Sequence, residues 1–291
     1  MKIITKMIIF FVIAQFLALF IGSTLINNAS RIQGYQSLNI AVGGQGEVFN
    51  AFNIIGAILI VSIFLLIIFL LPIRDLMIRV LEVSATIAAS TIVLFVVFSI
   101  FNVPLSDLVA LVISVILVLS KFIMPKLRTP LALIASAGVA AVLGFSLDPF
   151  PMVVLVIGIA IYDIIAVWWT KHMVIFAKQF VKMQTTFTIT ASGERGDIFQ
   201  WGEKSKRKPK FGSIELGTGD LSIPAALCVS AYKLGSFIFP LSAILGAIVG
   251  LYLVLEAVEK ERKIMPAMPS IGMFSLLFLF AAIMFSYFFG F

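Results

Sequence analysis

The chain has 291 residues, of which 61% are apolar and only 12% are charged. Ordinary globular domains contain roughly 45–50% apolar residues. This composition excludes a soluble globular protein, which would need a polar surface, and it indicates a polytopic membrane protein. The net charge of +7 is distributed over short loops between apolar segments, which is typical of membrane topology and not of nucleic-acid binding.

The scarcity of cysteine and histidine excludes several kinds of site. The single cysteine excludes a disulfide framework and a multi-cysteine metal site. The single histidine, His172, excludes an H-E-x-x-H zinc motif. We therefore expect neither a metal nor another cofactor.

Nine apolar segments predict an all-α membrane protein with nine transmembrane helices. The first segment follows N-terminal lysines, and because no convincing small-residue cleavage site comes after it, we expect a retained span. The fifth is rich in alanine and glycine, which let helix backbones approach closely, so it is predicted to lie inside the bundle. The predicted spans are residues 7–27, 51–72, 78–101, 105–122, 130–147, 151–170, 216–233, 236–256 and 268–290.

The basic residues predict the orientation of these spans. If the N-terminus is cytoplasmic, all but Arg31 and Lys233 of the 21 lysines and arginines fall on the cytoplasmic side. The bias persists when the long loop after the sixth span is set aside. We therefore expect a cytoplasmic N-terminus and an extracytoplasmic C-terminus.

The chain is predicted to have three parts. Residues 1–184 form a six-span bundle that ends in an interfacial helix, residues 185–215 form a cytoplasmic linker loop, and residues 216–291 form a three-span part. Within the linker, Thr185–Thr190 has strand composition and precedes a glycine-containing turn and Asp197–Phe199. Either a small hairpin or a mobile loop is expected there.

Two aspartates fall inside predicted spans, Asp163 in the sixth and Asp220 in the seventh. An ionised side chain inside a bilayer costs roughly 2.5–3.5 kcal/mol on insertion scales, so such a residue indicates a function and a partner. At about 1.5 Å per residue, Asp163 lies roughly 10 Å and Asp220 roughly 6 Å inside the cytoplasmic boundary. Consecutive antiparallel helices are commonly neighbours, so the sequence permits a facing pair of carboxyl groups.

A facing pair of carboxyl groups has a defined chemistry. Two carboxylates at close range do not both ionise easily, so the pair holds one proton and can position a water molecule. The ionised member acts as a general base on the water, and the protonated member donates to a carbonyl oxygen, which hydrolyses a peptide bond. The same aspartates also suit a proton-coupled transporter or ion leak pathway, or a helix contact in a non-catalytic scaffold.

The residues around these aspartates carry further expectations. Gly217 and Gly219 are expected to permit unusual backbone angles or the close approach of another chain. Glu82 stands three residues after Arg79 and is expected to form a local ion pair near the cytoplasmic edge.

Three motifs resemble those of the GxGD intramembrane aspartyl proteases, the group that includes presenilin and signal peptide peptidase. Tyr162-Asp163 lies in the sixth span, and Gly217-Thr218-Gly219-Asp220 lies at the start of the seventh. Pro266-Ala267-Met268 occupies the place of the family's Pro-Ala-Leu motif at the start of the ninth span, with methionine in place of leucine. The N-inside orientation resembles presenilin, because signal peptide peptidase is inverted.

The resemblance implies an enzyme that cleaves single-span transmembrane substrates within the lipid bilayer. It implies that Asp163 and Asp220 are the catalytic pair and that eight further positions bind substrate or support the motifs. The implied reaction involves neither nucleic acid nor metal.

Compact loops suggest a prokaryotic, archaeal-type homologue in the plasma membrane that needs no accessory subunits. A homo-oligomer is left open. The stretch Thr185–Thr190 is a candidate for pairing with an extended substrate as an added strand. The eight supporting positions are Tyr162, Leu216, Gly217, Thr218, Gly219, Pro266, Ala267 and Met268.

Overall fold

The computed structural model describes residues 3–28, 47–70, 73–169, 185–192, 213–261 and 265–289. Within these ranges, each of the nine predicted spans corresponds to one α-helix. The helices are α1 (Ile3–Asn27), α3 (Glu47–Leu70), α4 (Arg74–Ile100), α5 (Ser106–Ser120), α6 (Arg128–Ser146), α7 (Pro149–Ile164), α9 (Thr218–Tyr232), α10 (Ile238–Glu261) and α11 (Met268–Phe289). The shorter elements are the 3₁₀ turn η1 (Pro125–Leu127), the π-helical turn η2 (Ile165–Trp169) and the strands β1 (Thr188–Ser192) and β2 (Ser213–Gly217).

Among the described residues, six helical segments are long and apolar enough to cross a bilayer. They are α1, α4, α6 with η1, α7 with η2, α10 and α11. Helix α3 has 24 residues, whereas α5 and α9 are shorter, with 15 residues each. The protein is therefore a predominantly helical, polytopic membrane protein.

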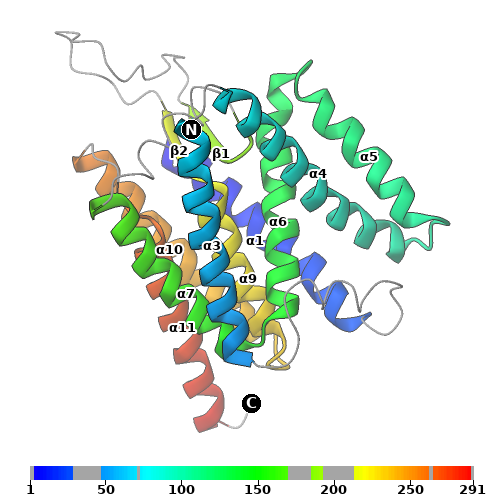
Figure 1. Ribbon diagram of the computed structural model, residues 1–291. Coiled ribbons are helices and arrows are strands. Elements are labelled where there is room, and N and C mark those ends of the chain that lie inside the picture. The colour runs from blue at the N-terminus through cyan, green and yellow to red at the C-terminus, as the bar shows by residue number, and fades with distance from the viewer. Residues whose placement is uncertain are drawn as a thin grey trace.

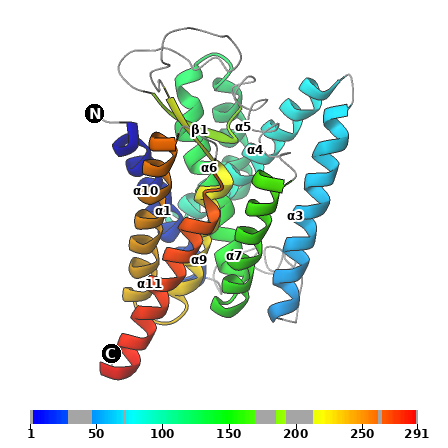
Figure 2. The same ribbon diagram turned by 90° about the vertical axis from the view of Figure 1, so that its left-hand side faces the viewer.

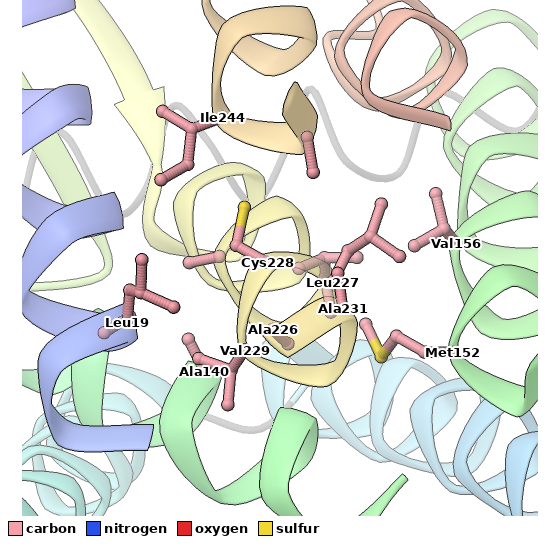
Figure 3. Close-up of a cluster of buried hydrophobic side chains, with 14 of the residues drawn as sticks. Leu19, Ala140, Met152, Val156, Ala226, Leu227, Cys228, Val229, Ala231 and Ile244 are labelled. Carbon is pink, nitrogen blue, oxygen red and sulfur yellow. The ribbon is translucent and has the colours of Figure 1, made fainter. Parts of the chain in front are cut away.

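Helix α9 is the central helix of the bundle. It contacts α1, α6, α7, α10 and α11, and every residue from Leu221 to Ala231 is buried. A helix that is apolar on all sides belongs in an interior, and Figure 3 shows its side chains among residues of α1, α6, α7 and α10. These neighbours include Leu19 of α1, Ala140 of α6, Met152 and Val156 of α7 and Ile244 of α10.

Glycines on two neighbouring helices let the α9 backbone come close. A Cβ atom at Gly144 of α6 would lie 2.4 Å from the carbonyl oxygen of Ala226, and one at Gly22 of α1 would lie 2.3 Å from Cγ1 of Val229. Small residues permit such approaches because no side chain separates the backbones. The prediction that the alanine- and glycine-rich α6 lies inside the bundle is confirmed, since ten of its residues are buried.

The strands β1 and β2 form a two-stranded antiparallel sheet, with Thr188 opposite Gly217 and Thr190 opposite Glu215. The expected strand at Thr185–Thr190 therefore exists, but it begins at Thr188 and pairs with the segment just before α9. Residues 172–184 and 197–199, where an interfacial helix and the second arm of a hairpin were predicted, lie outside the described residues.

The prediction that the seventh span begins at Leu216 is wrong by two residues. Leu216 and Gly217 end strand β2, and the helix begins at Thr218, whose backbone N–H donates to the Phe187 carbonyl at 2.9 Å. Leu216 and Gly217 pair with β1, so their backbone hydrogen bonds are made without a helix. An apolar sequence pattern cannot reveal this pairing, because the partner strand is distant along the chain.

The sheet lies at the end of the bundle that carries the N-terminus, and the C-terminus lies at the opposite end (Figures 1 and 2). Since α7 runs toward the sheet and α9 runs away from it, the end of α7 and the start of α9 are brought to the same end of the bundle. This is where the two aspartates lie.

Candidate active site

Asp220 is the third residue of α9, and local geometry holds its carboxyl group. Gly217 is the residue that caps this helix, and its backbone forms a hydrogen bond with the Asp220 carboxyl group. An acidic side chain at the third helical position that reaches back to the capping residue satisfies one of the free N–H groups at a helix start. The spacing of Gly217 and Asp220 in the motif therefore fixes the carboxyl group by itself.

Asp163 is the penultimate residue of α7, directly before the π-helical turn η2. Its side chain is buried, and Oδ2 accepts a hydrogen bond of 3.2 Å from the backbone N–H of Met268, the first residue of α11. A second backbone hydrogen bond comes from Ala267. The first N–H groups of a helix have no partner within the helix, so they are suited to a carboxylate.

The structure brings the three predicted motifs to one place. Asp163 and Asp220 interact electrostatically, and Asp163 in turn is bonded to the Pro266-Ala267-Met268 segment. Asp163 is buried, whereas Asp220 is partly exposed. The replacement of leucine by Met268 leaves the contact to Asp163 intact because the backbone, and not the side chain, makes it.

The two glycines of the motif have different surroundings. Gly217 has φ −66° and ψ 143°, angles open to every residue, so the expected unusual backbone angle is absent there. A Cβ atom at Gly217 would lie 3.3 Å from Oδ2 of Asp220, whereas one at Gly219 would meet no atom within 4 Å. Gly217 thus leaves room for the carboxyl group, and the exposed Gly219 leaves open space beside it.

The other predicted supporting residues divide into packing and lining positions. Leu216 is buried in a cluster with residues of α1, α6 and α10, and Met268 is buried in the main core. Thr218 donates from Oγ1 to the Phe187 carbonyl at 3.2 Å. Tyr162, next to Asp163, is partly exposed.

Pro266 lines an apolar cavity of about 260 Å³ beside Asp163. The cavity lies between the end of α7, η2, α10 and the start of α11. It is almost entirely apolar, so it suits a hydrophobic side chain. Its lining residues are Ile164, Trp168, Leu253, Val254, Ala257, Met265, Pro266, Pro269 and Ser270.

A buried polar cluster next to the sheet was missed by the sequence predictions. Glu82 does not form the expected local pair with Arg79; it is buried and bonded to Lys121, at the end of α5, at 2.5 Å. A signal was present in the sequence, because Glu82, Thr86 and Ser90 form a polar stripe at helical spacing on an apolar helix, and all three are buried. Intramembrane polar stripes indicate partners inside the bundle.

Arg128, at the start of α6, completes this cluster. It bonds to Thr185 and Thr188 and interacts electrostatically with both Glu82 and Glu215. The pKa of the Glu215 carboxyl group is raised above its usual value, because the effect of burial is larger than the opposing effects of the Arg128 guanidinium and the Thr190 hydroxyl. The sequence predictions used Lys121 and Arg128 only to assign the orientation of the spans.

A helical membrane bundle with two interacting aspartates at one end fits the intramembrane aspartyl proteases, and comparisons with known proteins identify this class. The sequence profile of the family described as "Signal-peptide peptidase, presenilin aspartyl protease" matches residues 8–287. Comparison with curated protein sequences gave no significant match. The chain belongs to the signal-peptide peptidase and presenilin aspartyl protease family, and its activity is that of an intramembrane aspartyl protease.

Two solved structures of a presenilin family intramembrane aspartate protease are similar in fold. The one in space group C222 has a TM-score of 0.69 and 20% sequence identity and covers 98% of this chain and 100% of that chain. The one in space group P2 has a TM-score of 0.59 and 21% identity and covers 94% and 96%. The family match gives no support to the alternative of a transporter or ion leak pathway.

Proposed function

We propose that Asp163 and Asp220 are the catalytic pair that hydrolyses peptide bonds of single-span transmembrane substrates. The proposal rests on the meeting of three separate motifs at the Asp163 carboxyl group. Asp163 belongs to the first motif, Asp220 of the second interacts with it electrostatically, and the backbone N–H of Met268 in the third donates a hydrogen bond to it. The test is cleavage of a single-span peptide by the purified chain, with each aspartate replaced in turn by asparagine.

The proposed reaction needs only these two groups and a water molecule. The ionised carboxylate takes a proton from the water, whose oxygen attacks the substrate carbonyl carbon, while the protonated carboxyl group donates its proton to the carbonyl oxygen. The carboxyl group that took the proton from water then gives it to the amide nitrogen, and the carboxylate that lost its proton takes one back from a hydroxyl of the resulting diol. The C–N bond breaks, and a carboxylic acid and an amine are released. Backbone bonds from Gly217 to Asp220 and from Met268 to Asp163 hold both carboxyl groups in place for these steps.

A transmembrane helix must unwind before its carbonyl groups become available, and the sheet supplies a surface for the unwound chain. In the observed register, Glu215 and Thr190 form a pair without mutual backbone hydrogen bonds, so the backbone N–H and C=O of Glu215 point away from β1. On the other side of the sheet, the Thr188 carbonyl accepts from Arg128. We therefore assign substrate pairing to the outer edge of β2, and not to the predicted Thr185–Thr190 stretch.

Proline at position 215 tests this edge selectively. Glu215→Pro removes an N–H that points away from β1, so the sheet itself keeps its hydrogen bonds. We expect cleavage efficiency, kcat/KM, to fall about three- to tenfold, because one net hydrogen bond contributes about 0.5–1.5 kcal/mol. Glu215→Ala is the matched control for loss of the side chain, and equal kcat/KM values for the two variants would contradict strand addition at β2.

We further propose nine spans with a cytoplasmic N-terminus and an extracytoplasmic C-terminus, in the plasma membrane of a prokaryote. This rests on the basic-residue bias and agrees with the positions of the two termini at opposite ends of the bundle (Figure 1). The proposed active site then lies at the cytoplasmic end. Compact loops support cleavage without accessory subunits.

Cysteine labelling tests the orientation. The only native cysteine, Cys228, is buried, so an introduced cysteine is the sole accessible thiol. In intact cells, a membrane-impermeant maleimide is expected to label Tyr287→Cys and to leave Lys6→Cys unlabelled until the cells are opened. The reverse pattern would contradict the proposed topology.

A further inference from the structure

From the polar cluster around Glu82, we infer that the buried Glu82–Lys121 pair is an anchor that positions the β1–β2 sheet and, through it, the catalytic Asp220. The inference rests on the proposed function for its effect on cleavage. Within the part of the chain that the structure describes, the hydrogen bonds and ion pairs of Glu82 and Lys121 do not include Asp163 or Asp220, so we treat both as positioning residues.

The two charged side chains are buried almost completely. Glu82 on α4 is 3% exposed and Lys121 at the end of α5 is 8% exposed. Taking two charges out of water is costly, and a buried pair is often no more stabilising than an apolar pair of similar size. Stability alone therefore does not explain why an ion pair stands here. The other contacts of Glu82 indicate what the pair does.

Those other contacts converge on Thr186, two residues before β1. The same Glu82 oxygen that meets Lys121 accepts hydrogen bonds from the Thr186 backbone N–H and from Thr186 Oγ1, the latter at 2.9 Å. The hydroxyl of Thr86 lies 2.9 Å from Thr186 Oγ1. Lys121 thus holds the Glu82 carboxylate where it can bind the backbone that leads into the sheet.

Arg128 holds the same segment from α6. Its Nε donates to the Thr185 carbonyl, and Nη2 donates to Thr188 Oγ1 at 2.7 Å. Glu82 on α4 therefore binds Thr186, and Arg128 on α6 binds Thr185 and Thr188. A segment of four residues bonded to one buried and one half-buried charged group has little freedom to shift.

A short chain of contacts leads from this segment to the active site. Phe187, next to Thr186, accepts hydrogen bonds from both the backbone N–H and Oγ1 of Thr218. Thr218 begins α9, and Asp220 is two residues further along. A displacement of Thr186 would thus be passed through Phe187 to the start of the helix that carries the catalytic carboxyl group.

Two double variants separate positioning from packing. Glu82→Leu with Lys121→Met replaces the pair by apolar side chains and leaves no stranded charge, but it removes the acceptor for Thr186. Glu82→Gln with Lys121→Met also removes both charges, yet the glutamine Oε1 can still accept from Thr186. Any difference between them therefore reports the bond to Thr186.

We expect the leucine variant to lose at least tenfold in kcat with KM within twofold of wild type, and the glutamine variant to keep kcat within threefold. Amide hydrogen exchange at residues 186–191 should be at least tenfold faster in the leucine variant only. Exchange needs no substrate, so it tests the anchor even if the proposed cleavage is not observed. Lys233→Met, which breaks the ion pair with Asp148 at the other end of α6, is the control and should leave kcat and this exchange unchanged.

Unchanged exchange and kcat in a folded leucine variant, or equal losses in both double variants, would overturn the inference. If the leucine variant does not fold, Thr186→Val decides, because it keeps the ion pair and the backbone bond to Glu82 and removes only the Thr186 hydroxyl, with its bonds to Glu82 and Thr86. Faster exchange at residues 186–191 and a kcat about threefold lower are then expected. Wild-type exchange and kcat in Thr186→Val would overturn the anchor.

Discussion

Asp163→Asn and Asp220→Asn are each expected to lower the rate of peptide cleavage at least about a thousandfold, because a positioned acid or base contributes roughly 10²–10⁴-fold and the pair acts as a unit. Asparagine has the size of aspartate and its amide oxygen still accepts the backbone bonds from Met268 or Gly217. It neither takes a proton from water nor donates one to a carbonyl oxygen. The measurement is the rate of product formation from a single-span peptide in liposomes.

The matched control for this prediction is Asp148→Asn. Asp148 precedes α7, at the opposite end of the helix that carries Asp163, and it makes no side-chain capping hydrogen bond there. Its Oδ1 accepts from Lys233 Nζ at 3.0 Å, and the amide oxygen of asparagine can still accept that hydrogen bond. This variant should cleave at a rate within a factor of two of wild type, and all three variants should melt at similar temperatures. Cleavage at wild-type rate by either Asp163→Asn or Asp220→Asn would exclude the two-aspartate mechanism.

Gly219→Ala is expected to separate stability from activity. A methyl group at this exposed helical position meets no atom within 4 Å, and alanine favours a helix over glycine by about 1 kcal/mol, so the protein should become slightly more stable. The same methyl group would occupy the space beside Asp220 that an incoming substrate backbone needs. Because a misplacement of about 1 Å can cost about a hundredfold in rate, we expect kcat/KM to fall by that order.

Gly56→Ala controls for the general effect of replacing a helical glycine. A Cβ atom at Gly56 of α3 also meets nothing within 4 Å, and because Gly56 lies in the interior of its helix, Gly56→Ala should stabilise the protein at least as much as Gly219→Ala. Its kcat/KM should stay at the wild-type value. If Gly219→Ala cleaves as fast as Gly56→Ala, the substrate does not approach Asp220 from this side.

Much of the fold could be predicted from the sequence because the relevant signals are local. Apolar segments of membrane length predicted one helix each, and the small residues of α6 predicted its place inside the bundle. Asp163 and Asp220 were singled out as candidate site residues because a carboxyl group inside a span is costly and rare. The third motif was found through its resemblance to a family.

The missed features all depend on contacts between distant parts of the chain. Glu82 meets Lys121 across 39 residues and Thr186 across 104, whereas the sequence suggested Arg79, three residues away. The start of α9 was placed two residues too early because β2 pairs with a strand on the far side of the linker. Apolar patterning measures the character of a segment and carries no information about its partner.

The sequence by itself determined which segments are helices, which of them carry carboxyl groups, and at which end of the bundle those groups lie. Hydrophobic length and the cost of buried charge decide these properties segment by segment. Only the tertiary structure decided that the backbone N–H of Met268, 105 residues away, binds Asp163 and that a sheet leads directly to Asp220. Backbone donors are the same in every residue except proline, so their positions in the folded chain, and not their identities, select the partner.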